Sequence, residues 1–116
     1  MIQKTAFLLL LLGLARLSFA QATQHSVTLT WSDPSNPTTG TTYSIYRATG
    51  LCSGTPTFSK LASAVSGKSY VDTTVTPGNY CYQATATVNG MESAPSNTAA
   101  AAVPSFPPQG LSATVQ

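Results

Sequence analysis

Few side chains in this 116-residue chain could take part in catalysis. Its carboxylates are Asp33, Asp72 and Glu92, and its one histidine is His25. Hydrolysis by paired carboxylates needs two acids that converge on a cleft, and nucleophilic catalysis needs a base beside the nucleophile. The carboxylates fall in three separate segments, and we interpret Asp72 as a turn-forming side chain. We therefore expect no catalytic residues, no metal site and no cofactor.

The two cysteines, Cys52 and Cys81, could bind a metal, act as thiols or form a disulfide. A metal site would need more ligands, and a catalytic thiol would need a histidine placed beside it by the fold. In an exported protein, an even pair of cysteines is most simply a disulfide.

Carbohydrate binding would need a row of exposed aromatic rings that stack on sugars. Alternation along the chain places Tyr46 and Phe58 outward, whereas the other rings in the predicted strands point inward. One or two exposed rings provide a small platform, so a carbohydrate-binding accessory module is an alternative function and not the preferred one.

The N-terminus has the pattern of a secretory signal peptide. Lys4 precedes an apolar run over residues 6–14, and small residues allow cleavage after Ala20 or Ala22. The apolar run is too short to span a membrane. We expect residues 1–20 to be removed, leaving a secreted protein, periplasmic or extracellular, with no membrane segment.

Charge then argues against polyanionic partners. After cleavage, the three basic residues Arg47, Lys60 and Lys68 balance the three carboxylates, so the net charge is zero. A neutral domain lacks the basic patch that binds nucleic acid or an anionic membrane surface.

The rest of the chain alternates between apolar and polar residues with a period of two, which is typical of half-buried strands. An Asn89-Gly90 pair predicts a tight hairpin turn. The alanine run 99–102 favours helix intrinsically, but the turn before it and the nearby prolines favour a strand. The predicted strands span residues 26–31, 42–48, 58–66, 69–75, 80–88 and 92–103.

Four motifs, VTLTW, YSIYRA, SYVDTTVTPGNY and NGMESAPSN, together resemble a fibronectin type III domain of the bacterial secreted kind. The resemblance implies an all-β, immunoglobulin-like sandwich of about seven strands, with strands A, B and E facing C, C′, F and G. It implies a domain over residues 21–103, followed by a Pro-rich linker and tail over 104–116. Either Tyr80 or Tyr82 would close the turn into strand F. The implied core positions are Val27, Leu29, Trp31, Tyr43, Ile45, Tyr70, Val75, Tyr80 and Tyr82.

The resemblance also pairs the cysteines. In the family, strand C runs towards the pole from which strand F starts. Cys52 follows strand C, and Cys81 is the second residue of the predicted strand F. Cys81 lies on the outward phase of that strand, where a loop cysteine can reach it, so the implied disulfide is 52–81.

Strand A is missing from its expected place, because only a few residues separate the cleavage site from strand B. The tail PPQGLSATVQ has the strand A pattern, with Leu111, Ala113 and Val115 alternating. Three interpretations remain open. The tail is untied or belongs to a further module; it completes its own domain; or it completes another copy, which gives a head-to-tail homo-oligomer.

The resemblance implies a non-catalytic module for extracellular protein binding, adhesion or spacing, since the family serves chiefly in these roles. The partner would be an unknown extracellular protein or cell-surface component. Loops 33–40 and 88–91 share one pole and are candidate contacts.

The disulfide gives the first prediction. Mass spectrometry of the secreted protein, digested without reduction, should find the peptide of Cys52 linked to that of Cys81. Two free thiols in the native protein would contradict it.

Overall fold

The computed structural model describes residues 24–116, so the predicted signal peptide lies outside the described residues. This part of the chain contains strands and loops, and no helix in it is long and apolar enough to cross a membrane. The seven strands are β1 (Val27–Thr30), β2 (Thr42–Thr49), β3 (Ser59–Val65), β4 (Ser69–Asp72), β5 (Gly78–Val88), β6 (Met91–Glu92) and β7 (Ala99–Val103).

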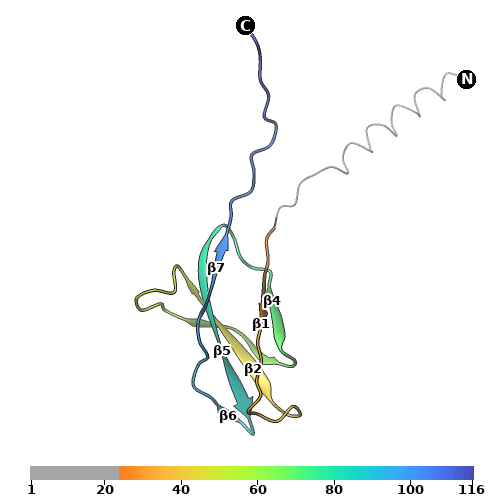
Figure 1. Ribbon diagram of the computed structural model, residues 1–116, viewed down its shortest axis with the longest axis vertical. Coiled ribbons are helices and arrows are strands. Elements are labelled where there is room, and N and C mark those ends of the chain that lie inside the picture. The colour runs from red at the N-terminus through yellow and green to blue at the C-terminus, as the bar shows by residue number, and fades with distance from the viewer. Residues whose placement is uncertain (1–23) are drawn as a thin grey trace, which may run out of the picture.

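The strands form two sheets of unequal width (Figure 1). β1 pairs with β4 in a two-stranded sheet. The five-stranded sheet has the order β3-β2-β5, and both β6 and β7 pair with the outer side of β5. All pairings are antiparallel. The predicted all-β sandwich is confirmed, with its last strand divided into two and no strand A among residues 24–116.

The β5–β6 connection follows its sequence signal. Asn89 and Gly90 both have positive φ, 51° and 78°, as a two-residue hairpin turn of type I′ requires. The predicted continuous strand over 92–103 is wrong, however. Residues 93–98 leave the ladder, and pairing resumes at Ala99. The alanine run does form a strand, because β5 supplies a hydrogen-bonded edge for it.

Two serines preserve the hydrogen bonds of β5 across that interruption. The Ser93 backbone N–H donates to the Ala86 carbonyl at 2.8 Å, and the Ala86 N–H donates to Ser93 Oγ at 2.9 Å. Ser96 makes the same pair of bonds with Ala84, at 2.8 and 2.9 Å. Each hydroxyl thus replaces a strand carbonyl. The intervening Pro95, which has no N–H to donate, can therefore leave the sheet without unpairing β5.

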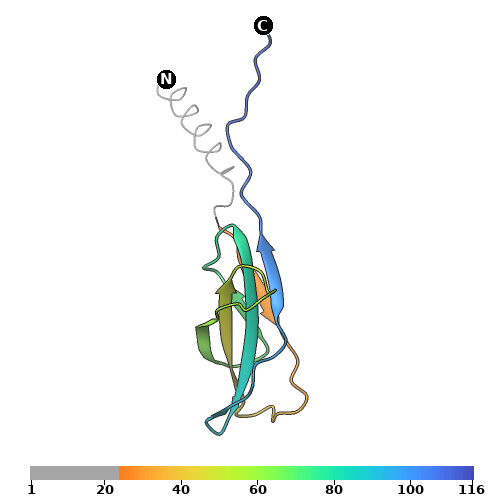
Figure 2. The same ribbon diagram turned by 90° about the vertical axis from the view of Figure 1, so that its left-hand side faces the viewer.

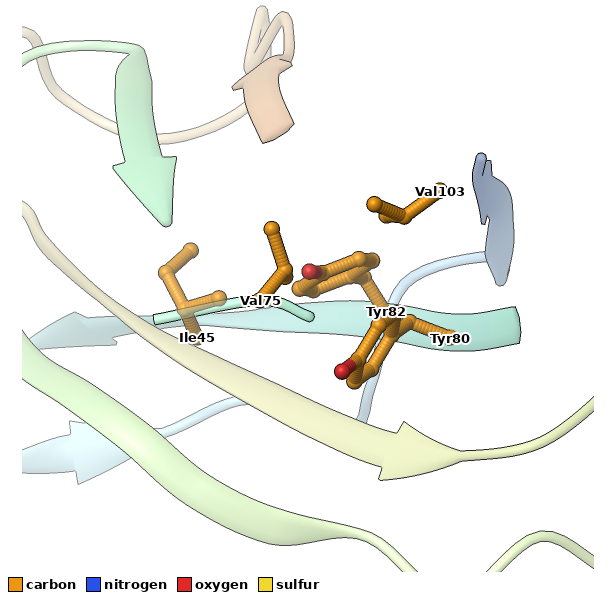
Figure 3. Close-up of a cluster of buried hydrophobic side chains, with 5 residues drawn as sticks. All are labelled: Ile45, Val75, Tyr80, Tyr82 and Val103. Atoms are coloured by element: carbon orange, nitrogen blue, oxygen red, sulfur yellow. The ribbon is translucent and has the colours of Figure 1, made fainter. Parts of the chain in front are cut away.

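Five buried side chains form the centre of the core (Figure 3): Ile45, Val75, Tyr80, Tyr82 and Val103. Tyr43 is buried as predicted. The predicted core residues Val27, Leu29, Trp31 and Tyr70 are only half-buried and pack around this centre. Val27, Leu29 and Tyr70 belong to the two-stranded sheet and Trp31 directly follows β1, and the narrowness of that sheet leaves one side of these residues uncovered. The sequence prediction missed Val103, whose burial depends on the pairing of β7 with β5.

At the pole where β5 begins, Cys52 and Cys81 form a disulfide, with Cα atoms 5.1 Å apart. Strand β5 starts two residues earlier than predicted, at Gly78. Cys81 points outward, as expected from its phase, yet it is 0% exposed. A bridge that closes a loop of this length restricts the unfolded chain and contributes about 3 kcal/mol.

Tyr80 closes the turn into β5. Its hydroxyl accepts a hydrogen bond of 3.0 Å from the Thr76 backbone N–H, four residues upstream. This is the geometry of a tyrosine corner. The structure therefore selects Tyr80 over Tyr82 for this role.

Replacing Tyr80 by Phe should remove this bond with little change in packing. We expect the free energy of unfolding to fall by about 1 kcal/mol, the usual loss for one hydrogen bond, as measured by urea denaturation. Tyr46→Phe is the matched control, because its hydroxyl bonds an exposed glutamate, Glu92, and a surface change of this kind costs about 0.5 kcal/mol or less. An equal loss in both variants would refute the corner's role.

Candidate functional site

The outer edge of β1 has no strand paired to it among residues 24–116. Trp31 donates its backbone N–H to Lys68 on the β4 side, at 3.1 Å. Ladder bonds alternate along an antiparallel strand, so Leu29 and Val27 also bond towards β4. The backbone N–H and C=O groups of Thr28 and Thr30 therefore face the outer edge, where another strand could pair with them.

A groove of about 430 Å³ borders this edge. It runs between β1 and the segment Ser93–Ala99, over the inward side of β2 and β5. The narrow sheet leaves this side of the sandwich uncovered, and the inward-facing alanines of β5 and β7 are correspondingly half-buried or exposed. Residues with apolar side chains along the groove include Leu29, Trp31, Ile45, Tyr82, Ala84 and Ala99.

One polar atom in the groove wall lacks a partner. Within residues 24–116, the indole N–H of Trp31 is buried and makes no hydrogen bond. A buried donor without an acceptor costs free energy. The Trp31 ring packs edge-on against Tyr43, with centroids 5.2 Å apart. A carbonyl group entering the groove would supply an acceptor of the kind this donor lacks.

A polar cluster forms one end of the groove. Asp33 accepts bonds from the Asn36 side chain at 2.8 Å and from the Tyr43 hydroxyl at 2.9 Å. The bond from Asn36, and secondarily that from Tyr43, lowers the pKa of the Asp33 carboxyl. Burial, reinforced by Asp33, raises the pKa of Tyr43. These shifts keep the tyrosine a neutral donor and the aspartate an anion that its neighbours already satisfy, which is unsuited to proton transfer.

The C-terminal tail starts beside β1. The Phe106 ring stacks on the His25 ring, with centroids 4.1 Å and planes 9° apart. Beyond this contact the tail leaves the sandwich, as both views show (Figures 1 and 2). Leu111 is 93% exposed and Val115 is 96% exposed, and Ala113 is exposed between them. The tail thus does not supply strand A to its own chain in this structure.

Asp72 forms a second polar cluster, between the sheets. It is 1% exposed and forms an ion pair of 2.8 Å with Arg47, which is 25% exposed. The Tyr82 hydroxyl donates to the same oxygen, Oδ2, at 2.8 Å. The Thr74 backbone N–H donates to Oδ1 at 2.9 Å. The turn bond to Thr74 matches the predicted turn-forming role of Asp72, whereas the ion pair was not predicted.

This cluster holds Asp72 charged. Burial alone would raise the pKa of the carboxyl, but hydrogen bonds from Thr74, Tyr82 and Arg47 outweigh it and lower the pKa to about 2. Burial and the neighbouring carboxylate raise the pKa of Tyr82. Asp72 lies on β4, Arg47 on β2 and Tyr82 on β5, so the cluster connects the two sheets.

The outer face of the wide sheet carries the one ring predicted to point outward from β2. The Tyr46 hydroxyl donates to Glu92 at 2.6 Å, and the Lys60 ammonium lies 5.6 Å from the ring centroid. Tyr46 is half-buried, as is Phe58, the other predicted outward ring. Because Lys60 lies over the Tyr46 ring, that ring is a poor stacking surface for a sugar.

The three carboxylates bind three separate sets of neighbours. Asp33 bonds Asn36 and Tyr43, Asp72 bonds the inter-sheet cluster, and Glu92 bonds Tyr46 and Thr85. No group of three or more His, Cys, Asp or Glu side chains that could hold a metal ion occurs within the described range 24–116. Each carboxylate is thus held by hydrogen bonds to its own neighbours.

Comparison with known proteins tests the fold. No family model matches the chain, and no curated protein sequence does. Among solved structures, the chain is similar to the solution structure of the fourth FNIII domain of a human protein. The likeness covers 78% of each chain, with 18% sequence identity and a TM-score of 0.56. The fold is that of a fibronectin type III domain.

In this fold the strands take the order that the motifs implied. β1 and β4 correspond to strands B and E, and β3, β2 and β5 to strands C′, C and F. Strand G is divided into β6 and β7. The groove beside β1 lies where a fibronectin type III domain has strand A. Two features of the sequence indicate these sites but did not enter the prediction. Arg47 has the inward phase of β2, which places it beside Asp72. Ala84 and Ala86 are small residues on the inward face of β5, where they line the groove.

Asp72 gives a pH-dependent prediction. Its pKa is about 2 in the folded protein against an ordinary 3.8. The stabilisation is therefore complete above about pH 4 and is lost as the pH falls towards 2, an effect of about 2 kcal/mol. Asp72→Asn should lower the free energy of unfolding at pH 7 by about 2–3 kcal/mol, less than for a fully buried pair because Arg47 reaches water.

Urea denaturation between pH 2 and 7 measures the difference between the parent and Asp72→Asn. This difference should shrink steadily below pH 4, because protonation removes the same charge from the parent. Asp33→Asn is the control for a carboxylate outside the inter-sheet cluster, and we expect a smaller loss. A gap between parent and Asp72→Asn that stays constant down to pH 2 would refute the argument.

Proposed function

We propose that this chain is a secreted, non-catalytic fibronectin type III module of the bacterial secreted kind, which acts in extracellular protein binding, adhesion or spacing. The observation that carries the proposal is the pairing-competent edge of β1 beside an apolar groove. Together they favour an extended polypeptide as the bound partner. Its main chain would pair with Thr28 and Thr30, and alternate side chains would enter the groove.

The proposed location rests on three features. The N-terminal sequence has the signal-peptide pattern. The 52–81 disulfide is compatible with an oxidising compartment outside the cytoplasm. The four motifs that resemble bacterial secreted fibronectin type III domains support the same origin.

We propose that the module is non-catalytic because its acidic and imidazole side chains already contact other residues. The described carboxylates are engaged in hydrogen bonds with neighbouring side chains, and His25 is stacked by Phe106. A strand-binding edge needs none of these groups to be reactive. The carbohydrate-binding alternative gains no support from Tyr46, since Lys60 and Glu92 already contact that residue.

The proposal is tested by adding a synthetic peptide of alternating valine and threonine to the ¹⁵N-labelled mature protein. We expect the backbone amides of Thr28 and Thr30 to shift in NMR spectra and to exchange more slowly with solvent, because strand pairing would engage them. The control peptide has the same composition, with all valines preceding all threonines. It should bind more weakly, since its apolar side chains do not share one face.

The outer edge of β4 provides an internal reference. By the same alternation, the amides of Ser69 and Val71 face away from β1. Equal shifts on both edges would indicate unspecific strand binding, and shifts confined to loop 33–40 would indicate a different contact. Either result would overturn the proposal for β1.

A further inference from the structure

We infer that the strand bound by β1 is the tail segment Leu111–Val115 of a second copy of this chain. The inference rests on the proposed function and names its partner. It assigns a partner to two parts of the molecule that pair with no other strand among residues 24–116. One is the β1 edge with its groove, and the other is an exposed tail with strand-like alternation.

The two surfaces match in pattern. A strand paired with Thr28 and Thr30 places every second side chain into the groove. In the tail these are Leu111, Ala113 and Val115, while Ser112 and Thr114 would face solvent. The opposing residues in the groove are small, since Ala84 and Ala99 line it. Small residues on one surface leave room for the larger leucine and valine on the other.

Burial also favours this partner. Leu111 and Val115 are almost fully exposed in the single chain. Transfer of both side chains into the apolar groove removes this area from water, and the pairing satisfies main-chain groups of Thr28 and Thr30. Tail carbonyl groups in the groove would also provide acceptors beside the unpartnered Trp31 N–H.

The donor is a second molecule because the tail is directed away from its own β1. The His25–Phe106 stack anchors residue 106 at the start of β1. Pro107 and Pro108 follow, and prolines favour an extended segment. Figures 1 and 2 show this segment pointing away from the sandwich. The same chain would have to reverse its direction completely to pair with β1.

The geometry also sets the order of assembly. The tail leaves at the pole where β7 ends and β1 begins. All strand pairs among residues 24–116 are antiparallel, and a tail that pairs with β1 in the same way must enter at the other pole, beside Trp31. The exit pole of one molecule therefore meets the opposite pole of the next. Such a head-to-tail contact uses two different surfaces, so it can repeat and gives linear chains of molecules.

Sedimentation equilibrium of the mature protein at concentrations up to about 1 mM tests the inference. We expect the average mass to rise with concentration. Leu111→Asp combined with Val115→Asp should leave monomers, because a buried unpaired charge opposes docking. The matched control, Ser112→Asp with Thr114→Asp, adds the same charge on the solvent face of the docked tail. It should associate like the parent.

The β1 edge is tested by Thr30→Pro. The Thr30 N–H points away from β4, so proline removes a docking donor without breaking the β1–β4 ladder. This variant should fold and remain monomeric. Val71→Pro makes the same change on the outer edge of β4 and should still associate. Circular dichroism confirms folding, and the tail variants keep the test valid if either proline variant unfolds.

The most decisive experiment mixes a variant that cannot accept a tail with a variant that cannot donate one. Thr30→Pro can donate a tail but not accept one, and a chain lacking residues 110–116 can accept but not donate. Mixed, they should form a one-to-one dimer that grows no further. The inference is overturned if the mature parent stays monomeric, if both Asp pairs act alike, or if Thr30→Pro associates. A monomeric parent that still binds the alternating peptide at Thr28 and Thr30 would refute the second-copy partner alone and leave the proposed function standing.

Discussion

The structure depends on holding a narrow sheet against a wide one. β1 and β4 together present two short strands to a five-stranded sheet, and a two-stranded ribbon is marginally stable by itself in water. Asp72 supplies the polar part of the attachment, since one carboxylate contacts side chains on two strands of the opposite sheet. Val75, just after β4, supplies apolar contact with the same core. The unequal widths also leave the groove beside β1, so the inter-sheet attachment and the proposed binding surface have a common origin.

Much of this fold was predictable from local pattern. Period-two alternation located the strands, and Asn89-Gly90 located the hairpin, because both signals come from backbone geometry and side-chain direction. The pairing of Cys52 with Cys81 followed once the strand order was assumed. The choice between Tyr80 and Tyr82 did not follow, since the two residues share one face of β5 and differ only in which upstream group they reach.

The site was less predictable, because it depends on which residues are left uncovered. Trp31 and Leu29 look like core residues in the sequence, and their half-burial reflects the missing neighbour of β1. The Arg47–Asp72 pair joins residues that are 25 positions apart on different sheets. The alternation of residues along each strand does not predict that the side chains of Arg47 and Asp72 meet. The interruption of the last strand depends on hydroxyl groups that bond across to β5, which strand propensity does not register.

The paired serines have a further consequence for the rim that borders the groove across from β1. By replacing carbonyl groups with hydroxyls, Ser93 and Ser96 satisfy β5 while their own stretch of backbone leaves the sheet plane. The rim formed by β6 and β7 is therefore discontinuous, with a proline at its centre. A discontinuous rim is a poor template for an added strand. The interruption thus makes this rim less suited than an unbroken strand to edge-to-edge stacking of molecules.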